Sequence, residues 1–427
     1  MTRVPNLNHQ QPVISGHADS APKRMRRAVE RLPDNGFART LILARTSFEG
    51  TSMNRRQFGL TAGSFVGLGL TSGAALPAPS EAPVPTAGAR DLYRRALVLD
   101  CNLAPDLDGQ LPLSPATLDT LRSSGVTVMK STLGGFDDSM DGTLAEIAFY
   151  QQLFEVHHDV FMQVRRTADF VTAKHENKLG IIFSFEGVGM LEGKLERIEL
   201  FRYLGVRVMQ LSYNNTSVFG SGVMVSAGSP GLTQLGHSAV AKMNELGVAI
   251  DLSHANPATT RDAMAASTRP VLMTHGGCAA VHPHPRNKTD EQLRALADKG
   301  GVIGIYDLPY LTASPRQPEV KDYIEHMAHA LTVCGEDHVG IGSDQSVQPF
   351  DTSPKGLKEF QEEEDKRHAA GVAAPEEDRP AYVAGLNIPN RCEVIADNLL
   401  KRGYPARVTE KVLGSNFVRA FGEIWKS

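Results

Sequence analysis

The sequence predicts an α/β protein folded as a (β/α)8 barrel, the TIM-barrel architecture. Short runs rich in Val and Ile alternate along the chain with patterns typical of helices, which implies a parallel sheet. Eight such runs are present, the number that closes this kind of barrel. No glycine-rich phosphate loop follows the first run, so the alternative of an open dinucleotide-binding sheet has less support.

The predicted strands share a content of β-branched residues and are bounded by turn residues. They are Ala96–Asp100, Val126–Ser131, Ile181–Phe185, Val206–Ser212, Val248–Ser253, Pro270–Thr274, Val302–Tyr306 and Val339–Ser343. A ninth run, Val160–Val164, is either an extra strand or part of a crossover. Helices are expected over Leu144–His157, Lys194–Tyr203, Gln234–Leu246, Glu291–Asp298, Lys321–Val333 and Pro389–Arg402.

Residues 351–386 depart from this alternation. The run GLKEFQEEEDKRHAAG has the charge pattern of a solvated helix, and Ala373–Pro380 is rich in Pro and Glu and is expected to be a loop. This insertion follows the last strand. It therefore either covers the mouth of the barrel or packs against a second copy of the chain in a homodimer, and the sequence leaves both open.

The amino-terminal residues are predicted to lie outside the barrel. Residues 1–52 are weakly patterned and are expected to be disordered, or to be an over-extended reading frame before a start at Met53. Residues 53–80 place Arg55-Arg56 before a glycine-rich uncharged run, as in a twin-arginine signal. We expect recognition by the twin-arginine export machinery and a periplasmic location. A linker over residues 81–90 then precedes a single catalytic barrel over residues 91–427.

Charge narrows the possible partners. The 427 residues carry a net charge of −4, while residues 1–56 hold ten Lys/Arg against four Asp/Glu and are therefore at +6. The remaining chain is at −10 by difference, which gives no reason to expect nucleic acid as a partner. A small-molecule substrate is the expected ligand.

Two histidines follow neighbouring strands at equivalent points. Ser253-His254 and Thr274-His275 each end an apolar run, and the segment between them is long enough for one helix, with Asn256 as its cap and Pro257 in its first turn. The carboxyl ends of adjacent barrel strands face one pocket, so the two imidazoles are expected to converge on a metal ion. The alternative is that each histidine merely caps its strand by hydrogen bonding.

Polar residues also end other predicted strands, and together they suit a hydrolytic metal site. The set is Asp100 and Asn102, Glu186, Tyr213 and Asn214, His254, His275 and Asp344. Imidazole and carboxylate are ligands for zinc, which lowers the pKa of its water to about 7, and a free carboxylate can take the proton. We therefore predict a metal-dependent hydrolase.

These residues lie in motifs that resemble the membrane (renal-type) dipeptidase family, peptidase family M19, which belongs with the amidohydrolase-type metal barrels. The resemblance spans roughly Asp91 to Trp425. It is carried by Phe185-Glu186-Gly187, GVRVMQLSYN ending at Asn214, Gly231-Leu232-Thr233, GVAIDLSH ending at His254, Met273-Thr274-His275, Pro285-Arg286-Asn287-Lys288, Gly342-Ser343-Asp344 and GSNFVR ending at Arg419.

The resemblance implies a role for each site residue. Glu186 would bridge two zinc ions, and His254 and His275 would bind the second. Asp344 would handle the proton of the water or of the leaving amine, and Arg286 would hold the substrate carboxylate or the tetrahedral intermediate through its planar fork. The implied reaction is hydrolysis of dipeptides, including those that contain a D-residue, by a metal-activated water.

The sequence departs from the family pattern at the end of the first strand. The family has a His and an Asp there as ligands of the first metal, where this chain has Asn102 and Ala104. Asp100 and Asn102 remain as candidate ligands of the first metal, and Asp106 and Asp108 follow closely in the sequence as possible substitutes for the missing ligands.

A second departure is Tyr213, which stands where many members have a histidine that contacts substrate and polarises the scissile carbonyl. A Tyr hydroxyl can donate a similar hydrogen bond, with Asn214 beside it on the substrate; the alternative is an aromatic side chain that packs under a loop.

Three interpretations follow from these departures. The chain is a one-metal hydrolase that uses Glu186, His254 and His275; or Asp100 and its neighbours keep a weaker first site for ordinary two-zinc dipeptidase chemistry; or the barrel binds a small ligand without hydrolysis. The retained ligand set and Asp344 favour a hydrolase. The altered first strand leaves open another small amide or a lactone as the substrate, because the fold does not determine the bond that is cleaved.

Overall fold

The structure is a computed structural model that describes residues 84–425 except 108, 135–138 and 226–227. The predicted segments 1–52 and 53–80 lie outside the described residues. No helix among the described residues is long and apolar enough to cross a membrane.

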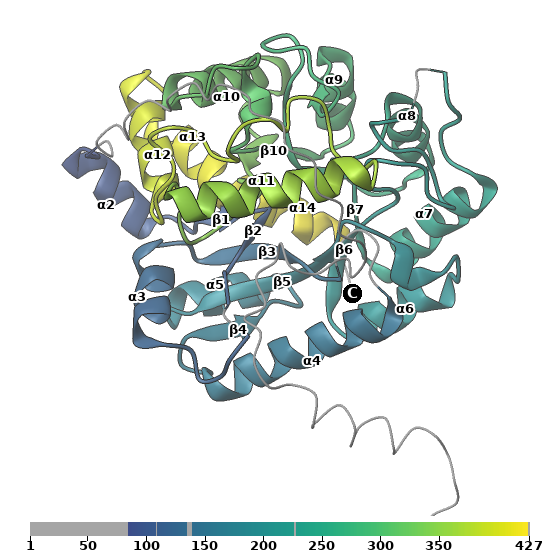
Figure 1. Cartoon of the computed structure of the whole chain (residues 1–427), viewed down its shortest axis with the longest axis horizontal. Coiled ribbons are helices and arrows are strands. Elements are labelled where there is room, and N and C mark those ends of the chain that lie inside the picture. Colours follow the sequence, from purple (N-terminus) through teal and green to yellow (C-terminus); the bar gives the residue numbers. More distant parts are fainter. Residues whose placement is uncertain (1–83, 108, 135–138, 226–227, 426–427) are drawn as a thin grey trace, which may run out of the picture. The chain divides into compact units, whose positions relative to one another are not determined.

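Eight parallel strands close a barrel, as the sequence predicted (Figure 1). Its strands are β1 (Leu99–Asp100), β3 (Val128–Thr132), β5 (Leu179–Phe185), β6 (Val206–Gln210), β7 (Ala249–Asp251), β8 (Leu272–Cys278), β10 (Val302–Ile305) and β11 (Val339–Ile341). Each strand pairs with the next one in this list, and β11 pairs with β1 to complete the circle. Every predicted barrel strand is therefore present, with ends that differ by a few residues.

Four short strands lie outside the circle. The ninth predicted run forms β4 (Phe161–Gln163). It pairs with β5, which also pairs with its barrel neighbours β3 and β6, so β4 is an extra edge strand. Strands β2 (Leu103–Ala104) and β12 (Gln345–Ser346) pair with each other just after β1 and β11. Strand β9 (Asn287–Lys288) pairs in parallel with the last two residues of β8. The β2–β12 and β8–β9 pairs add backbone at the rim where the barrel strands end.

Helices surround the strands. They are α2 (Ala87–Arg95), α3 (Pro115–Ser123), α4 (Met140–Val156), α5 (Ala168–His175), α6 (Glu196–Tyr203), α7 (Gln234–Leu246), α8 (Pro257–Ala266), α9 (Asp290–Asp298), α10 (Val320–Cys334), α11 (Pro354–Ala369), α12 (Arg391–Lys401), α13 (Ala406–Glu410) and α14 (Asn416–Ile424). The predicted start of α8 is confirmed, because the Asn256 side chain accepts a hydrogen bond from the Thr259 N–H.

The linker expected over residues 81–90 needs correction at its end. Helix α2 already begins at Ala87 and packs against α12. Thr86 caps it and also binds Asp397 of α12 through its N–H and its hydroxyl, at 2.9 and 2.7 Å. Long-range bonds of this kind, which local sequence does not reveal, make this segment part of the packed unit.

Helix α14 closes the amino-terminal end of the barrel. Phe417, Phe421 and Ile424 are buried against the amino-terminal parts of the strands, including Leu99 and Val128. The opposite, carboxyl-terminal rim carries the polar residues that the sequence singled out.

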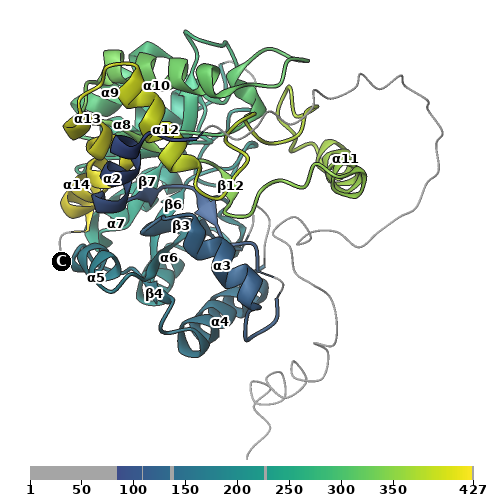
Figure 2. The same ribbon diagram turned by 90° about the vertical axis from the view of Figure 1, so that its left-hand side faces the viewer.

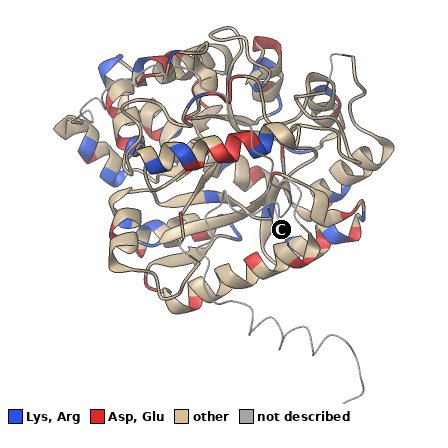
Figure 3. Ribbon diagram, in the orientation of Figure 1, with Lys and Arg blue, Asp and Glu red and all other residues tan. Residues whose placement is uncertain are grey.

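The insertion lies on that carboxyl-terminal side of the barrel. Helix α11 crosses in front of the strands in Figure 1 and stands on the side away from α14 in Figure 2. Its outer surface is densely charged (Figure 3), with ion pairs one turn apart such as Lys355–Glu359 at 3.5 Å. The segment after α11 binds the rim loops: the Val372 carbonyl accepts from Asn214, and the Pro375 carbonyl bonds with His284. Within one chain, the insertion thus packs onto the mouth of the barrel.

Candidate metal centre

Three side chains that lie in or just after separate strands meet at the rim. Glu186 directly follows β5, His254 follows β7, and His275 lies in β8. One ligand atom from each lies within 4.8 Å of the other two. His254 Nε2 is 3.0 Å from His275 Nε2 and 3.8 Å from Glu186 Oε2. The convergence of the two histidines predicted from their spacing is therefore present.

The hydrogen bonds of His254 orient its ring. Its Nδ1 lies 2.7 Å from Asn214 Oδ1, while Asn214 Nδ2 donates to the Val372 carbonyl at 2.8 Å. An amide oxygen only accepts, so Nδ1 of His254 must carry the proton. The Nε2 lone pair of His254 then points at His275 and Glu186.

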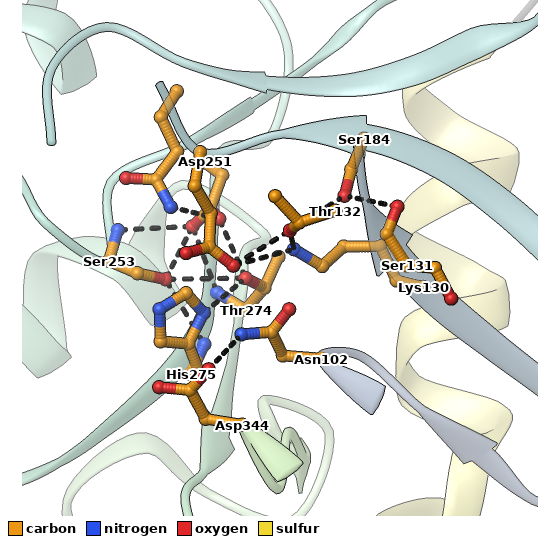
Figure 4. Close-up of polar contacts among 12 residues, drawn as sticks. Asn102, Lys130, Ser131, Thr132, Ser184, Asp251, Ser253, Thr274, His275 and Asp344 are labelled. Atoms are coloured by element: carbon orange, nitrogen blue, oxygen red, sulfur yellow. Dashed lines mark hydrogen bonds and ion pairs between the residues drawn. The ribbon is translucent and has the colours of Figure 1, made fainter. Parts of the chain in front are cut away.

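A chain of hydrogen bonds orients His275 in the same way (Figure 4). The Thr274 hydroxyl donates to Asp251 Oδ2 at 2.6 Å, so its oxygen accepts from His275 Nδ1 at 3.0 Å. Burial raises the pKa of Asp251, but Lys130, His275 and hydrogen bonds from Ser253 and Thr274 outweigh burial, and the net pKa is lowered. Asp251 is thus an acceptor, and His275 also presents an Nε2 lone pair.

Two imidazole lone pairs therefore face each other across 3.0 Å. Both rings are neutral: burial lowers the pKa of His254 well below its ordinary value, and burial also lowers that of His275 although Asp344 and Glu186 oppose it. Facing lone pairs repel unless a cation lies between them. The ligand atoms of a tetrahedral zinc site are about 3.3 Å apart, given bonds of about 2.0–2.1 Å. The three residues therefore fit one divalent ion.

The two oxygens of Glu186 have different neighbours. Oε2 faces His254, whereas Oε1 accepts a 2.7 Å hydrogen bond from the Thr132 hydroxyl and lies 3.9 Å from Lys130 Nζ. Lys130 and Thr132 both belong to β3, and the Lys130 side chain is fully buried. One carboxylate oxygen thus faces the histidines, and the other faces a cation of the protein.

The end of β1 is built differently from the sequence expectation. Asp100, expected as a ligand, accepts from the Ser343 N–H at 2.9 Å, from the Ser343 hydroxyl and from the Asn102 N–H at 3.1 Å. Burial raises its pKa. Both of its oxygens are thereby used inside the protein, and Asp100 is not among the residues that gather around the metal position.

Asn102 is placed beside the proposed proton carrier. Its Nδ2 donates to Asp344 Oδ1 at 2.6 Å, and the Asp344 N–H donates to the Asn102 carbonyl at 2.7 Å. Asn102 Oδ1 is buried with no hydrogen-bond partner within the described part of the chain. Asn102 therefore positions Asp344, and ligation by its remaining oxygen stays a prediction. Asp106 bonds Gln348 through its backbone, and Asp108 lies outside the described residues.

Asp344 has an unusual backbone. Its φ is 58°, in the left-handed region that few residues other than glycine adopt. The preceding Gly342 allows this strand end to approach β8, because a Cβ there would lie 1.8 Å from the Thr274 carbonyl oxygen. Strained backbone of this kind is typical of functional sites, and Figure 4 shows the Asp344 side chain next to Asn102 and near His275.

Arg286 and Tyr213 lie close to His254. Arg286 precedes β9, is 2% exposed, and its Nε and Nη2 have no hydrogen-bond partner within the described residues. A buried guanidinium with free donors is suited to an anionic ligand. The Tyr213 ring stacks on His254 with centroids 4.2 Å apart, and burial raises its pKa, so its hydroxyl keeps its proton. Sequence reasoning chose both positions.

Asn214 holds the His254 ring and the insertion together. It was predicted to contact substrate, but both polar atoms of its buried side chain are engaged, one with His254 and the other with Val372 of the insertion. It therefore couples the orientation of the His254 ring to the segment that covers the rim.

Sequence reasoning assigned no role to Lys130 and Asp251. Both are charged residues inside predicted strands, Val126–Ser131 and Val248–Ser253, whose other members are mostly apolar. A charge in the middle of a buried strand is rarely tolerated without a partner, and this was the available signal. Thr274, which links Asp251 to His275, carries no such signal.

The fold and the site define a class, the metal-dependent hydrolases built on a (β/α)8 barrel. A profile of the membrane dipeptidase family, peptidase family M19, matches residues 101–365, more than half of the chain. The chain belongs to this family, as its motifs indicated.

Curated relatives agree with this assignment. An uncharacterized protein from the pqqA 5′ region of Klebsiella pneumoniae is 30% identical over 68% of this chain and 98% of its own length. Dipeptidase tcpJ of Claviceps purpurea is 27% identical, and dipeptidase verJ of Clonostachys rogersoniana is 30% identical, each over 67% of this chain. The chain spans 60% and 66% of the length of these two fungal proteins.

Solved structures share the fold. An amidohydrolase from Pseudomonas aeruginosa is 28% identical with a TM-score of 0.69, over 79% of this chain and 99% of that one. A metallopeptidase from Rhodobacter sphaeroides, solved with a phosphinate mimic of the dipeptide L-Ala-D-Ala, has a TM-score of 0.60 at 20% identity, over 72% and 90% of the two chains.

Proposed function

We propose that this protein is a dipeptidase whose divalent metal, zinc by the choice of ligands, is held by Glu186, His254 and His275. The observation that carries the proposal is the pair of imidazole lone pairs 3.0 Å apart, each fixed by a hydrogen bond at Nδ1. The relatives named dipeptidases support the substrate class.

When bound, the ion supplies a Lewis acid at neutral pH. The protein supplies the remaining chemistry. Arg286 would bind the substrate carboxylate with its two free donors, which places the peptide carbonyl toward the histidines. Tyr213, next to His254, would donate a hydrogen bond to that carbonyl oxygen.

Asp344 is the proposed proton carrier. One of its oxygens is held by Asn102 at 2.6 Å, which leaves the other to accept a proton from water and pass it to the leaving amine. Hydrolysis of a peptide bond needs one such transfer in each direction, so a single carboxylate at the centre of the rim suffices. Dipeptides that contain a D-residue belong to the proposed substrate range.

A metal-replacement assay tests the function. The full chain is stripped with a chelator, reloaded with zinc or cobalt, and assayed with a panel of L,L- and L,D-dipeptides and matching dipeptide amides. We expect activity that requires the ion, and a preference for free carboxylates that is lost in Arg286→Met. Activity that is unaffected by complete metal removal contradicts the proposal.

Asp344→Asn separates chemistry from metal binding in the same assay. We expect kcat to fall by roughly 10²–10⁴-fold with unchanged metal content, because general acid–base catalysis contributes about that much. Asp290→Asn, an acidic residue whose carboxylate pairs with His329 outside the pocket, serves as the control.

The end of β1 favours a second candidate substrate class. Asn102 and Ala104 replace the family's ligands there, so the pocket presents a different wall to the substrate. The alternative function is hydrolysis of another small amide or a lactone, or binding of such a compound without hydrolysis. Adding N-acyl amides and lactones to the panel distinguishes these outcomes, since a binder protects the fold against heat without turnover.

Export through the twin-arginine pathway to the periplasm is also proposed, on the arginine pair at 55–56. Replacement of both arginines by lysine should retain the precursor in the cytoplasm, detected by fractionation. A homodimer is a further proposal, for which sedimentation of the purified chain is the measurement.

A further inference from the structure

We propose that this barrel binds one divalent ion and not two, because the buried side chain of Lys130 occupies the place of the second cation beside Glu186. This inference rests on the proposed function only in that a metal is bound at Glu186, His254 and His275. It assigns to Lys130 a positioning role in a one-ion site.

The contacts of Lys130 are the first support. Its Nζ lies 3.9 Å from Glu186 Oε1 and 3.5 Å from the Thr132 hydroxyl, and its side chain is fully buried on β3 (Figure 4). No other carboxylate forms an ion pair with Lys130 in the described part of the chain. A buried ammonium is kept only when charged or polar partners surround it, so this contact is built into the fold.

The two oxygens of Glu186 are the second support. A carboxylate that bridges two ions gives one oxygen to each. Here Oε2 faces His254, while Oε1 is already bound by the Thr132 hydroxyl at 2.7 Å and approached by Lys130. Oε1 of Glu186 therefore already faces a hydrogen-bond donor and a cation of the protein, and a second metal ion would have to compete with both for it.

The end of β1 is the third support. A second ion next to Oε1 would need further anionic ligands, but Asp100 gives its oxygens to Ser343 and to the Asn102 N–H. Asn102 offers one neutral oxygen, and Ala104 offers none. A divalent ion there would also be repelled by Lys130 at close range.

Lys130 also acts on the histidine side of the site. Its charge is the largest of the opposing effects that keep the pKa of Asp251 low despite burial, and Asp251 orients His275 through Thr274. Lys130 thus stabilises the buried carboxylate of Asp251 and the part-buried carboxylate of Glu186, which would otherwise lie uncompensated when the site is empty or half filled.

Metal stoichiometry in designed variants tests the inference. Four full-length proteins are compared: the wild type; Asn102→His with Ala104→Asp; that pair with Lys130→Gln; and, as a matched control, the same pair with Lys288→Gln. Lys288 is equally buried but donates to the carbonyls of Leu252 and Ala255. Each is stripped, incubated with excess Co²⁺, desalted and analysed for metal per chain and by electron paramagnetic resonance for spin coupling.

We expect one ion per chain in the wild type, in the double variant and in the Lys288 control. The Lys130 triple variant should hold two, with the coupled signal of a bridged pair. Two ions in the wild type or in the double variant would overturn the inference while leaving the metal hydrolase intact. No ion in a folded wild type would instead refute the proposed function. A folded triple variant that still binds one ion also counts against Lys130, and if that variant does not fold, the wild-type and double-variant stoichiometries still decide.

Discussion

The ends of β7 and β8 and the end of β1 lie on the same rim of the barrel, but the polar side chains at the two places are hydrogen-bonded differently. After β7 and in β8, hydrogen bonds at Nδ1 hold the rings of His254 and His275, and their Nε2 atoms face each other at 3.0 Å. At β1, both carboxylate oxygens of Asp100 accept hydrogen bonds, from Ser343 and from the Asn102 N–H.

The difference teaches how a strand-end residue becomes a ligand. All of these residues lie in or just after barrel strands on the same rim, so their place in the fold alone does not decide which of them can bind a metal ion. A ligand needs one atom anchored by the protein and another left unpaired, whereas a residue with every atom paired serves packing. Four ways to break or sharpen this contrast follow, from the largest expected effect to the smallest.

Removal of a ligand should have the largest effect. We expect His275→Ala to lose metal by more than about 100-fold in affinity, since loss of a mere orienting partner already costs 10–100-fold. Activity should fall with it while the fold persists, as measured by elemental analysis, turnover and circular dichroism. Retention of metal and activity would remove the basis of the contrast.

Removal of an anchor should have the next largest effect. Asn214→Ala frees Nδ1 of His254, and we expect metal affinity to drop by about 10–100-fold, measured by competition with a chelating dye. The matched control is Asn215→Ala, whose side chain also bonds the insertion, at the Gly371 carbonyl, but does not touch His254. Equal losses in both variants would mean that the insertion, and not the histidine tautomer, controls binding.

Asp100→Ala should affect stability and not metal. The Ser343 N–H and hydroxyl and the Asn102 N–H would lose their acceptor inside the protein. We expect the free energy of unfolding to fall by about 1–3 kcal/mol in urea titrations, with metal content unchanged. Loss of metal from a variant of normal stability would return Asp100 to the ligand set.

The smallest effect concerns pH. The buried His326 side chain bonds to strand β8. Its Nδ1 accepts from the Cys278 N–H at 2.9 Å, and its Nε2 donates to the Leu311 carbonyl. Burial lowers the pKa of His326 to about 4 from 6.5. Below about pH 6.5, His326 is therefore protonated in the unfolded chain, whereas in the folded chain it stays neutral until about pH 4.

This difference makes stability fall with pH over that window. We expect a loss of about 1 kcal/mol between pH 7 and pH 5.5 from this group. Urea midpoints of the metal-free protein across the window provide the measurement, and His326→Gln should flatten the profile, with exposed His158→Gln as the control. A steeper profile in His326→Gln would contradict the assignment.

The sequence by itself determined the barrel, because apolar β-branched runs report burial directly and each must find a sheet partner. It also placed Glu186, His254, His275 and Asp344 on one rim, since residues that directly follow strands share a rim in any parallel barrel, whereas Arg286 came only from the family motif. These local signals do not depend on which distant side chain each residue contacts in the fold.

Only the tertiary structure decided which atoms of those residues are free. Three pairings across the barrel join residues that are far apart in the sequence. Asn214 bonds His254 over 40 residues, Ser343 bonds Asp100 over 243, and Lys130 faces Glu186 over 56. Hydrogen bonding and charge compensation act through space, so a buried lysine in a strand is visible in the sequence, but its partner is not.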